Sequence, residues 1–385
     1  MSALTGSRVI FVLGWADLGG AERNALDLAS HLRSAHAAEV EVLALTARDG
    51  SARRLWLERG ISWHGADVSW SGGRAYKARV LGSVGWQLRA RRPDVIVPYC
   101  TRPNVLCGLV WRATGASLAV WNQQDVNPSR AFGSATIRRA LAWTPLAFAN
   151  SVTARNFLVS EWGARPERVH AVLGDVEPVV ARGAGPAWRR RLGIGDDAVV
   201  ALMSAHLHAF KDHATLLRAW RIALDRVADS PAPALVLAGR PAGKEAELKA
   251  LAFDLDLGGS VVFAGEVADV GGLLDACDIG VLSSRRESRP RAVLEYMANG
   301  LPVAGTDIPG ILELVGDEGA RFLAPPGDAE RLAAALLELI TSPELRRAAG
   351  SANQQRLARA RLAASAGSEK AAALVAAALD RARRR

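Results

Sequence analysis

The sequence predicts an α/β fold of two Rossmann-like domains, each with a parallel β-sheet. Short apolar runs alternate with longer segments of helical periodicity along most of the chain, which is the pattern of strands joined by covering helices. Gly174–Pro186 has three glycines, two prolines and no clear period, which indicates a break between two such halves. A length of 385 residues is sufficient for two domains with large cores.

The first half carries apolar runs of the length of buried strands. Such runs, rich in Val, Leu, Ile and Ala without polar alternation, are typical of parallel strands covered on both faces. The expected strands are Arg8–Leu13, Val40–Ala44, Asp94–Pro98, Leu118–Trp121, Leu146–Ala149 and Val169–Val172. A helix is expected over Gly20–Ser34.

The second half repeats this pattern. Strands are expected at Val199–Met203, Ala234–Ala238, Val261–Phe263, Ile279–Leu282, Pro302–Ala304 and Arg321–Leu323. Helices are expected at Thr215–Val227, Glu245–Leu255, Val270–Ala276, Arg291–Asn299 and Ala329–Thr341, and from Pro343 onwards. We therefore expect a first domain over residues 1–178, a linker over 179–190, a second domain over 191–362, and a helix over 363–385 that returns to the first domain.

Composition narrows the class of protein. No apolar run approaches the 18 or so residues of a membrane span, and the N-terminus lacks the features of a signal peptide. Three cysteines without paired spacing favour a reducing cytoplasm over a disulfide framework. The net charge of +9 is uneven, because residues 1–180 carry 21 Lys+Arg against 14 Asp+Glu.

One basic segment, Val68–Pro93, has six Lys and Arg residues and no acid, and it also contains Trp70, Tyr76 and Trp86. A basic stretch with aromatic residues can lie on an anionic membrane surface. A solvated helix with basic flanks has the same composition, so both interpretations stay open.

Two glutamates, Glu287 and Glu295, are separated by seven residues, and Pro290 between them suits the first position of a helix. The second carboxylate then lies about five residues into the helix, roughly 7.5 Å along its axis. A helix N-terminus attracts phosphate groups, and a carboxylate nearby can accept both hydroxyls of a ribose. An apolar run, Gly300–Ala304, and a turn at Asp307–Gly310 follow. The arrangement suits a nucleotide diphosphate that carries a sugar.

This stretch resembles the E-x7-E signature of family 4 retaining glycosyltransferases, with their G-L-P-V and D-x-x-G segments after it. Leu18–Arg23 is similar to the family's first glycine-rich loop, Leu207–Leu217 to its basic phosphate loop, and Gly265–Leu282 to the segment around its nucleobase pocket. The similarity is strong over Met203–Pro326 and loose over Asp49–Asn150. It implies the GT-B fold of the group 1 glycosyl transferases, with two Rossmann-like domains facing a central cleft.

The resemblance also implies roles for particular residues. Lys211 and His206 would hold the diphosphate, although relatives have an arginine where His206 stands, and Glu287 would contact donor-sugar hydroxyls. These three form the expected catalytic set. The expected donor-binding set is Gly19, Gly20, Gly239, Arg240, Glu266, Val267, Arg291, Ala292, Val293 and Glu295.

Two other motifs are excluded by the residues present. Gly14–Gly20 lacks both the lysine and hydroxyl of a P-loop and the spacing of a dinucleotide fingerprint, which argues against NTP hydrolysis. His206, His208 and His213 have no acid or cysteine at ligand spacing, so no metal site is predicted.

Gln124 and Asp125 end a first-domain strand. Many relatives have a histidine where Gln124 stands, and a glutamine cannot carry a proton, so a histidine base is excluded here. Gln124 and Asp125 are expected to contact the acceptor or the sugar. An N-cap or Asx-turn role for Asp125 ahead of Asn127–Ser129 is equally open.

The function expected from the resemblance is metal-independent, retaining transfer of a hexose from a nucleotide-diphosphate sugar to a hydroxyl acceptor, without a cofactor. Polysaccharide, glycolipid or glycoconjugate assembly is the expected context, in the cytoplasm or at the inner face of the membrane. A lipid-linked acceptor fits the basic first half. A natural-product glycosyltransferase and a nucleotide-sugar-processing enzyme of the same fold are the alternatives. Nucleic-acid binding is disfavoured, because no recognised binding motif accompanies the charge.

Overall fold

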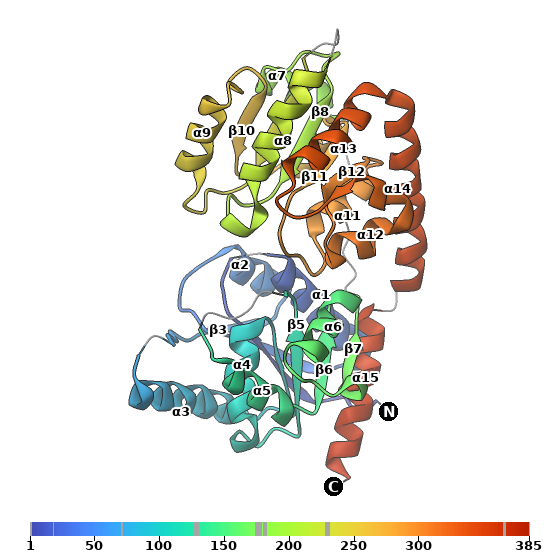
Figure 1. Ribbon diagram of the computed structural model, residues 1–385. Coiled ribbons are helices and arrows are strands. Elements are labelled where there is room, and N and C mark those ends of the chain that lie inside the picture. The colour runs from blue at the N-terminus through green and yellow to red at the C-terminus, as the bar shows by residue number, and fades with distance from the viewer. Residues whose placement is uncertain are drawn as a thin grey trace. The chain divides into compact units, whose positions relative to one another are not determined.

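The computed structural model describes residues 2–17, 19–70, 72–126, 131–173, 179, 183–227, 232–364 and 367–384. The chain divides into two compact units. The first unit consists of Met1–Val176 with Ala363–Arg385, and the second of Glu177–Leu362 (Figure 1).

The first unit is built on a seven-stranded parallel sheet in the order β3-β2-β1-β4-β5-β6-β7. Its strands are β1 (Arg8–Leu13), β2 (Glu39–Ala44), β3 (Ser62–Gly65), β4 (Val95–Pro98), β5 (Leu118–Gln123), β6 (Leu146–Ala149) and β7 (Val169–Ala171). Its helices are α1 (Gly20–His36), α2 (Ser51–Glu58), α3 (Arg74–Ala90), α4 (Thr101–Val110), α5 (Ser134–Trp143), α6 (Val152–Ser160) and α15 (Gly367–Arg383), with short 3₁₀ turns η1 (Trp111–Ala113) and η2 (Pro166–Arg168).

Each face of this sheet has its own core. Along β1, Val9, Phe11 and Leu13 belong to one hydrophobic cluster, whereas Ile10 and Val12 belong to another, because successive side chains of a strand point to opposite faces. Buried residues of α1, α2 and α15 complete the first cluster, and those of α3, α4, α5 and α6 complete the second. Both faces of the sheet are therefore covered by helices.

Helix α15 fastens the end of the chain to the first unit. Arg383 forms an ion pair with Asp94 at 2.7 Å and donates to the carbonyl of Ala3, and Lys370 donates to the carbonyl of Ala171. These contacts lie at the two ends of the helix, and its buried alanine, valine and leucine side chains pack between them.

The second unit is built on a six-stranded parallel sheet in the order β10-β9-β8-β11-β12-β13. Its strands are β8 (Val200–Ser204), β9 (Ala234–Ala238), β10 (Val261–Gly265), β11 (Ile279–Leu282), β12 (Val303–Thr306) and β13 (Leu323–Ala324). Its helices are α7 (Gly185–Leu192), α8 (His213–Arg226), α9 (Glu245–Asp254), α10 (Val270–Asp275), α11 (Arg291–Ala298), α12 (Pro309–Gly319), α13 (Ala329–Thr341) and α14 (Pro343–Ala364), with η3 (Ala209–Lys211) and η4 (Ala320–Phe322).

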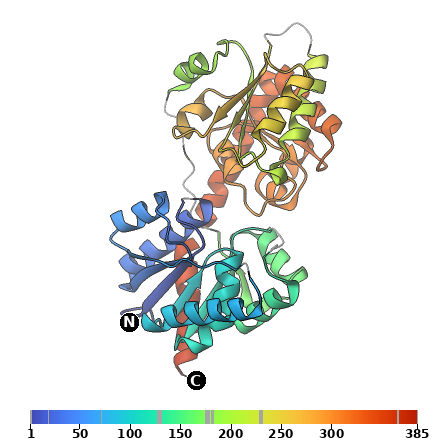
Figure 2. The ribbon, with the colours of Figure 1, turned by 90° about the vertical axis from the view of Figure 1, so that its left-hand side faces the viewer.

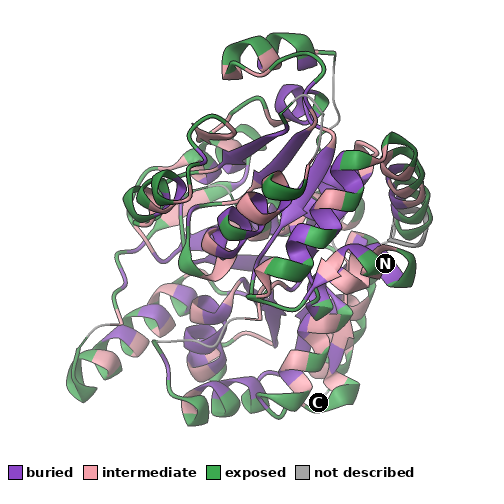
Figure 3. Ribbon diagram, turned by 45° about the horizontal axis from the view of Figure 1, so that its top comes forward, coloured by how far each residue is buried: buried purple, intermediate pink, exposed green. Residues whose placement is uncertain are grey.

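Helices again cover both faces, and strands β8, β9, β11 and β12 are deeply buried, whereas β10 is half-buried (Figures 2 and 3). Counted within the unit, the strand order is 3-2-1-4-5-6, which is the doubly wound Rossmann order. No helix in the described ranges is both long and apolar enough to cross a membrane.

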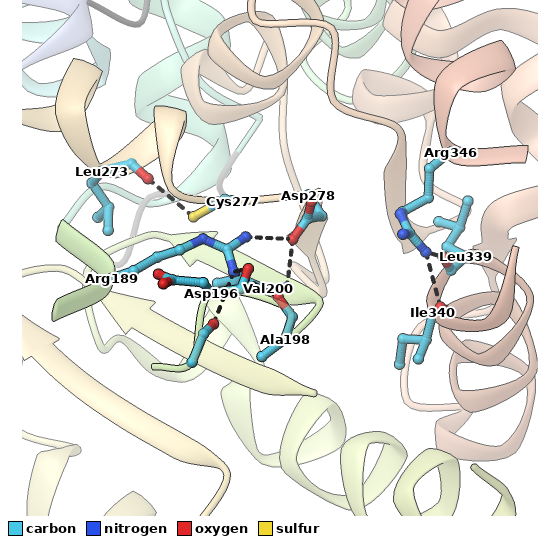
Figure 4. Close-up of polar contacts among 11 residues, drawn as sticks. Arg189, Asp196, Ala198, Val200, Leu273, Cys277, Asp278, Leu339, Ile340 and Arg346 are labelled. Atoms are coloured by element: carbon cyan, nitrogen blue, oxygen red, sulfur yellow. Dashed lines mark hydrogen bonds and ion pairs between the residues drawn. The ribbon is translucent and has the colours of Figure 1, made fainter. Parts of the chain in front are cut away.

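Helix α7 occupies the second half of the segment expected to be a linker, residues 179–190. Contacts of Arg189 hold α7 against the second unit (Figure 4). Its guanidinium donates to the carbonyls of Gly195, Asp196 and Ala198 and pairs with Asp278 at 3.0 Å. Asp278 in turn accepts from the backbone of Val200, so α7 is tied to the start of the central strand.

Three local expectations were wrong. Strand β3 was missed, because Ser62–Gly65 is a half-exposed edge strand without an apolar run. The turn at Asp307–Gly310 opens a helix, α12, with Pro309 at its first turn. Arg321 lies in η4, and the strand begins only at Leu323.

Candidate functional site

The second sheet has its topological switch point between β8 and β11. The strand that follows β8 in the chain, β9, lies towards one edge of the sheet, and the strand that follows β11, β12, lies towards the other edge. Ligands of doubly wound folds bind outside the carboxyl ends of the strands at such a point. The loop after β8 contains His206 and Lys211, and the loop after β11 contains Glu287. Three residues expected from the sequence therefore lie on the two loops at the position that the topology favours.

Hydrogen bonds fasten these two loops to each other. The Ser283 hydroxyl donates to the carbonyls of Lys211 and Asp212 at 3.0 and 3.1 Å. The backbone amide of Arg285 donates to the carbonyl of Phe210, and the Arg285 guanidinium pairs with Asp212 at 2.8 Å. Asp212 is buried and stands in the left-handed region at φ 53°. The backbone that presents Lys211 is thus held from both sides.

Lys211 forms an ion pair with Glu287 across the switch point. The side chains keep 18% and 13% of their surface exposed, so the pair is mostly withdrawn from water. Desolvation makes a mostly buried pair depend on good geometry and further polar partners. Lys211 also lies 5.1 Å from the centre of the Phe210 ring.

A second ion pair lies on helix α11. Arg291 contacts Glu295 at 2.8 Å, one turn along the helix, and Glu295 is buried. Helix α11 begins at Arg291 as expected, with Pro290 as its N-cap residue rather than at its first position, and the Pro290 carbonyl accepts from the Leu294 amide. The amides of the first turn, Arg291 to Val293, have no acceptor within the helix, which makes this end electropositive.

Gly310 of α12 packs closely against the loop that carries Glu287. A Cβ added there would lie 2.2 Å from the carbonyl oxygen of Glu287 and 2.9 Å from that of Ser288. Only glycine leaves the loop of Glu287 in place, which gives the D-x-x-G segment a structural role.

His206 lies beside Lys211 but is exposed. Partial burial lowers its pKa, Arg240 and Lys211 lower the pKa further, and Glu266 raises it in part. An imidazole with a pKa below its usual range is mainly neutral at pH 7. His206 therefore does not supply a fixed positive charge in the absence of a ligand, and its expected role stays a prediction.

The residues expected around the base lie at the ends of β9 and β10. Gly239 approaches the loop of His206 so closely that a Cβ would lie 2.1 Å from the carbonyl oxygen of Ala205. Its amide donates to Gly265 at 2.7 Å, which joins β9 to β10 just ahead of Glu266 and Val267. Arg240 accepts from the Leu207 amide through its carbonyl. These residues therefore share the edge of the sheet that carries Lys211.

The remaining expected residues lie in the first unit. Gly19 caps α1, and its amide donates to the Glu22 carboxylate at 3.1 Å. Burial raises the pKa of Glu22. A Cβ on Gly20 would meet nothing within 4 Å, so a ligand can approach the backbone there. Leu18 lies outside the described residues.

Gln124 belongs to a polar cluster that the sequence did not predict. Its side chain accepts from Asn24 of α1 at 3.0 Å and donates to Asn122 at 2.5 Å. Asn104 of α4 is hydrogen-bonded to the backbone of Asn122 in both directions. Spacing gave no signal for this cluster, because its members come from three separate elements. Asn127–Ser129, which the Asx-turn interpretation of Asp125 requires, lie outside the described residues.

Metal ligands are not clustered in the described parts of the chain, where no three His, Cys, Asp or Glu side chains lie close enough to hold an ion. His213 is buried beside the switch point. Burial, followed by the charge of Lys211, lowers its pKa to about 4. It is a neutral core residue at physiological pH.

Comparison with known families matches residues 185–356 to the family described as "Glycosyl transferases group 1". Putative glycosyltransferase EpsD of Bacillus subtilis is 30% identical over 49% of this chain and 49% of its own length. D-inositol 3-phosphate glycosyltransferase of Geodermatophilus obscurus is 30% identical over 69% of this chain and 58% of its own. The chain spans about half the length of most curated relatives that it matches.

Solved structures match nearly the whole chain. HepE of Anabaena in complex with UDP and glucose has a TM-score of 0.80 at 20% identity, covering 96% of this chain and 100% of that one. WaaG, described as a glycosyltransferase involved in lipopolysaccharide biosynthesis, has a TM-score of 0.69 at 18% identity, covering 95% and 99%. These likenesses identify the fold.

Proposed function

Since residues 185–356 belong to the glycosyl transferases group 1 family and the chain has the GT-B fold, we propose that this protein transfers a sugar from a nucleotide-diphosphate donor to a hydroxyl acceptor. We propose further that it is of the family 4 type, retains the configuration of the anomeric carbon, and uses neither a metal ion nor a cofactor.

The observation that carries this proposal is the position of Lys211. It stands at the switch point of the second sheet on a loop that is hydrogen-bonded on both sides, next to the loop that leads into α11. A fixed cation and a helix N-terminus at one edge favour binding of a diphosphate. The same groups stabilise the negative charge that develops on the leaving group, without reorganisation during the reaction.

The two carboxylates suit the hydroxyl groups of the donor. Glu295 lies one turn into α11, where it can accept from the ribose while Arg291 holds one of its oxygens. Glu287 lies beside Lys211, where it can accept from hydroxyls of the transferred sugar. Gly239, Arg240, Glu266 and Val267 would then surround the base through their backbones.

Retention fits a front-face route. The acceptor oxygen forms its bond to the anomeric carbon on the side from which the diphosphate leaves, and the diphosphate oxygen takes the acceptor proton. The protein then supplies position and charge rather than a base. Gln124, which cannot take a proton, is consistent with this route and would bind a hydroxyl.

Relatives guide the choice of substrate. HepE was crystallised with UDP and with UDP-glucose, so we propose UDP-sugars as the first donors to test. Curated relatives include a D-inositol 3-phosphate glycosyltransferase and a lipopolysaccharide core glycosyltransferase, LpsE. We propose an anionic or lipid-linked hydroxyl acceptor that binds the first unit, in the cytoplasm at the inner face of the membrane.

Thermal unfolding with nucleotides tests the proposal without knowledge of the acceptor. UDP, GDP and their glucose and mannose forms are added to the wild type and to Lys211→Met. A ligand that binds the folded state raises the melting temperature by mass action. We expect one base series to raise it in the wild type, and the rise to shrink in the variant. Lys249→Met, an exposed lysine of α9, is the control. No rise with any nucleotide would refute the proposal.

A further inference from the structure

The first unit has one strongly basic part. Residues 68–160 contain twelve Lys and Arg residues and two acids, Asp94 and Asp125, which gives +10 within a chain whose total is +9. Asp94 is already paired with Arg383. This part comprises helices α3 to α6, which cover one face of the first sheet. Apart from Arg130, which lies outside the described residues, these Lys and Arg residues therefore lie on or next to the helices of one layer of the unit.

Tryptophans accompany this charge at the ends of three helices, and two of them are exposed, whereas Trp111 is partly buried. Trp86 lies in the last turn and a half of α3 and is 71% exposed, Trp111 follows α4, and Trp143 ends α5 and is 39% exposed. A helix between parallel strands runs back against them, so its C-terminal end lies at the edge where the next strand begins. The three tryptophans thus occur at the edge opposite to Gly20 and Gln124.

Direct contacts join these helix ends into one surface. Arg89 of α3 donates to the carbonyl of Ala113 at 3.2 Å, and the Trp111 indole donates to the carbonyl of Trp143 at 3.1 Å. Arg112 lies over both rings, 5.5 Å from Trp111 and 5.8 Å from Trp143. We call this surface the tryptophan rim and define it as Arg79, Trp86, Arg89, Trp111, Arg112, Arg139 and Trp143.

The rim is not the buried side of its helices. Val80, Val84 and Leu88 form the buried stripe of α3, and Trp86 is about 200° around the helix from Val84. Arg79 lies within about 20° of Trp86 on that outward side. On α5, Arg139 is exposed and precedes Trp143 by four residues, so the two share a face. Arg139 therefore lies beside Trp143, and Arg79 lies two turns, about 10.5 Å, before Trp86 on the same side of α3.

We propose that the tryptophan rim docks this protein on an anionic lipid bilayer. Indole rings favour the boundary between water and hydrocarbon, and arginine beside them attracts acidic head groups. A second copy of the chain is a poorer occupant, because it would bring two strongly positive surfaces together. This inference extends the proposed membrane contact to a defined surface. Binding is measured without donor, so its failure leaves the proposed sugar transfer intact.

The test is co-sedimentation of the full chain with vesicles of phosphatidylcholine, alone or with about one third phosphatidylglycerol. We expect binding to the acidic vesicles and its loss at high salt. Each charge near the surface changes partitioning about fivefold. Arg79→Glu with Arg139→Glu changes the charge by four and should abolish binding. Trp86→Ala should weaken it about tenfold. Arg89 and Arg112 are left unchanged because they hold the rim together.

Two controls match these variants in chemistry but lie in the second unit. Arg190→Glu with Arg359→Glu makes the same change in net charge at exposed positions, and Phe253→Ala removes an aromatic ring that is 83% exposed. Both should bind as the wild type does. Melting temperatures within a few degrees of the wild type verify that each variant is folded.

Several outcomes would overturn the proposal. One is equal binding to neutral and acidic vesicles. Another is equal loss of binding in the rim variants and in the charge-matched control. Salt-sensitive binding to RNA or DNA that the rim variants abolish, without vesicle binding, would assign the surface to nucleic acid. A dimer by light scattering that Trp86→Ala dissociates would assign it to a second copy.

Discussion

Lys211 has two roles that experiments can separate: it pairs with Glu287, and it is proposed to bind the nucleotide. In Lys211→Met the Glu287 carboxylate, 13% exposed, loses its cation. Breaking a fully buried pair costs 3–5 kcal/mol. Since both side chains keep some contact with water, we expect a loss of about 2 kcal/mol in the free energy of unfolding. Adding Glu287→Gln removes the stranded charge and should restore most of that stability.

Nucleotide affinity should behave differently. A charge-assisted contact with phosphate contributes about 2 kcal/mol, so Lys211→Met should weaken binding of UDP, or of the nucleotide that binds best, about 30-fold. This loss should persist when Lys211→Met is made in the Glu287→Gln background, although stability recovers there. The assays are urea unfolding for stability and titration calorimetry for the dissociation constant.

The refuting result is specific. If Lys211→Met in the Glu287→Gln background left nucleotide affinity unchanged, Lys211 would act only by holding Glu287. The proposed contact between this lysine and the diphosphate would then be wrong. Lys211→Arg, which keeps the charge, should retain most of the affinity.

Three further predictions concern neighbouring positions. Gly310→Ala places a Cβ 2.2 Å from the Glu287 carbonyl oxygen and should cost about 1–3 kcal/mol in thermal unfolding, whereas Gly258→Ala, where a Cβ meets nothing within 4 Å, should not. Because the pKa of His213 is about 4 in the folded state against about 6.5 unfolded, its contribution to stability is complete above pH 6.5 and is lost as the pH falls to about 4. Urea unfolding at pH 7 and pH 4.5 should show that His213→Gln loses less stability than the wild type, by up to roughly 3 kcal/mol, and equal losses would contradict this. Because the lowered pKa keeps His206 neutral, nucleotide affinity should be flat from pH 7 to pH 9, and His206→Arg should raise it several-fold in calorimetry.

The sequence predicted the central strands well because burial leaves a clear signal. Arg8–Leu13, Ala234–Ala238 and Ile279–Leu282 were expected with the bounds that the structure has. These strands are covered on both faces, so nearly every residue is apolar. The edge strand Ser62–Gly65 and the helix after Pro309 were missed, because partial exposure and a Pro-Gly pair typical of turns conceal them.

The site was predicted unevenly for a related reason. Lys211, Glu287 and Glu295 lie in contiguous motifs, and the structure brings the first two together. Pairing between a cation and a carboxylate far apart in the chain, or between Asn24 and Gln124, depends on the sheet order, which no local pattern encodes. The lowered pKa of His206 depends likewise on the folded structure, first through burial and then through neighbours such as Arg240, which follows a different strand.

The two ion pairs at the switch point have a consequence for selectivity. Lys211 is matched with Glu287, and Arg291 with Glu295, before any ligand arrives. A simple anion such as inorganic phosphate would draw a cation away and leave a carboxylate without compensation. A molecule with phosphate and hydroxyl groups at the right separation satisfies both members of each pair at once. We therefore expect the resting site to bind inorganic phosphate more weakly than a nucleotide sugar, which offers both kinds of group.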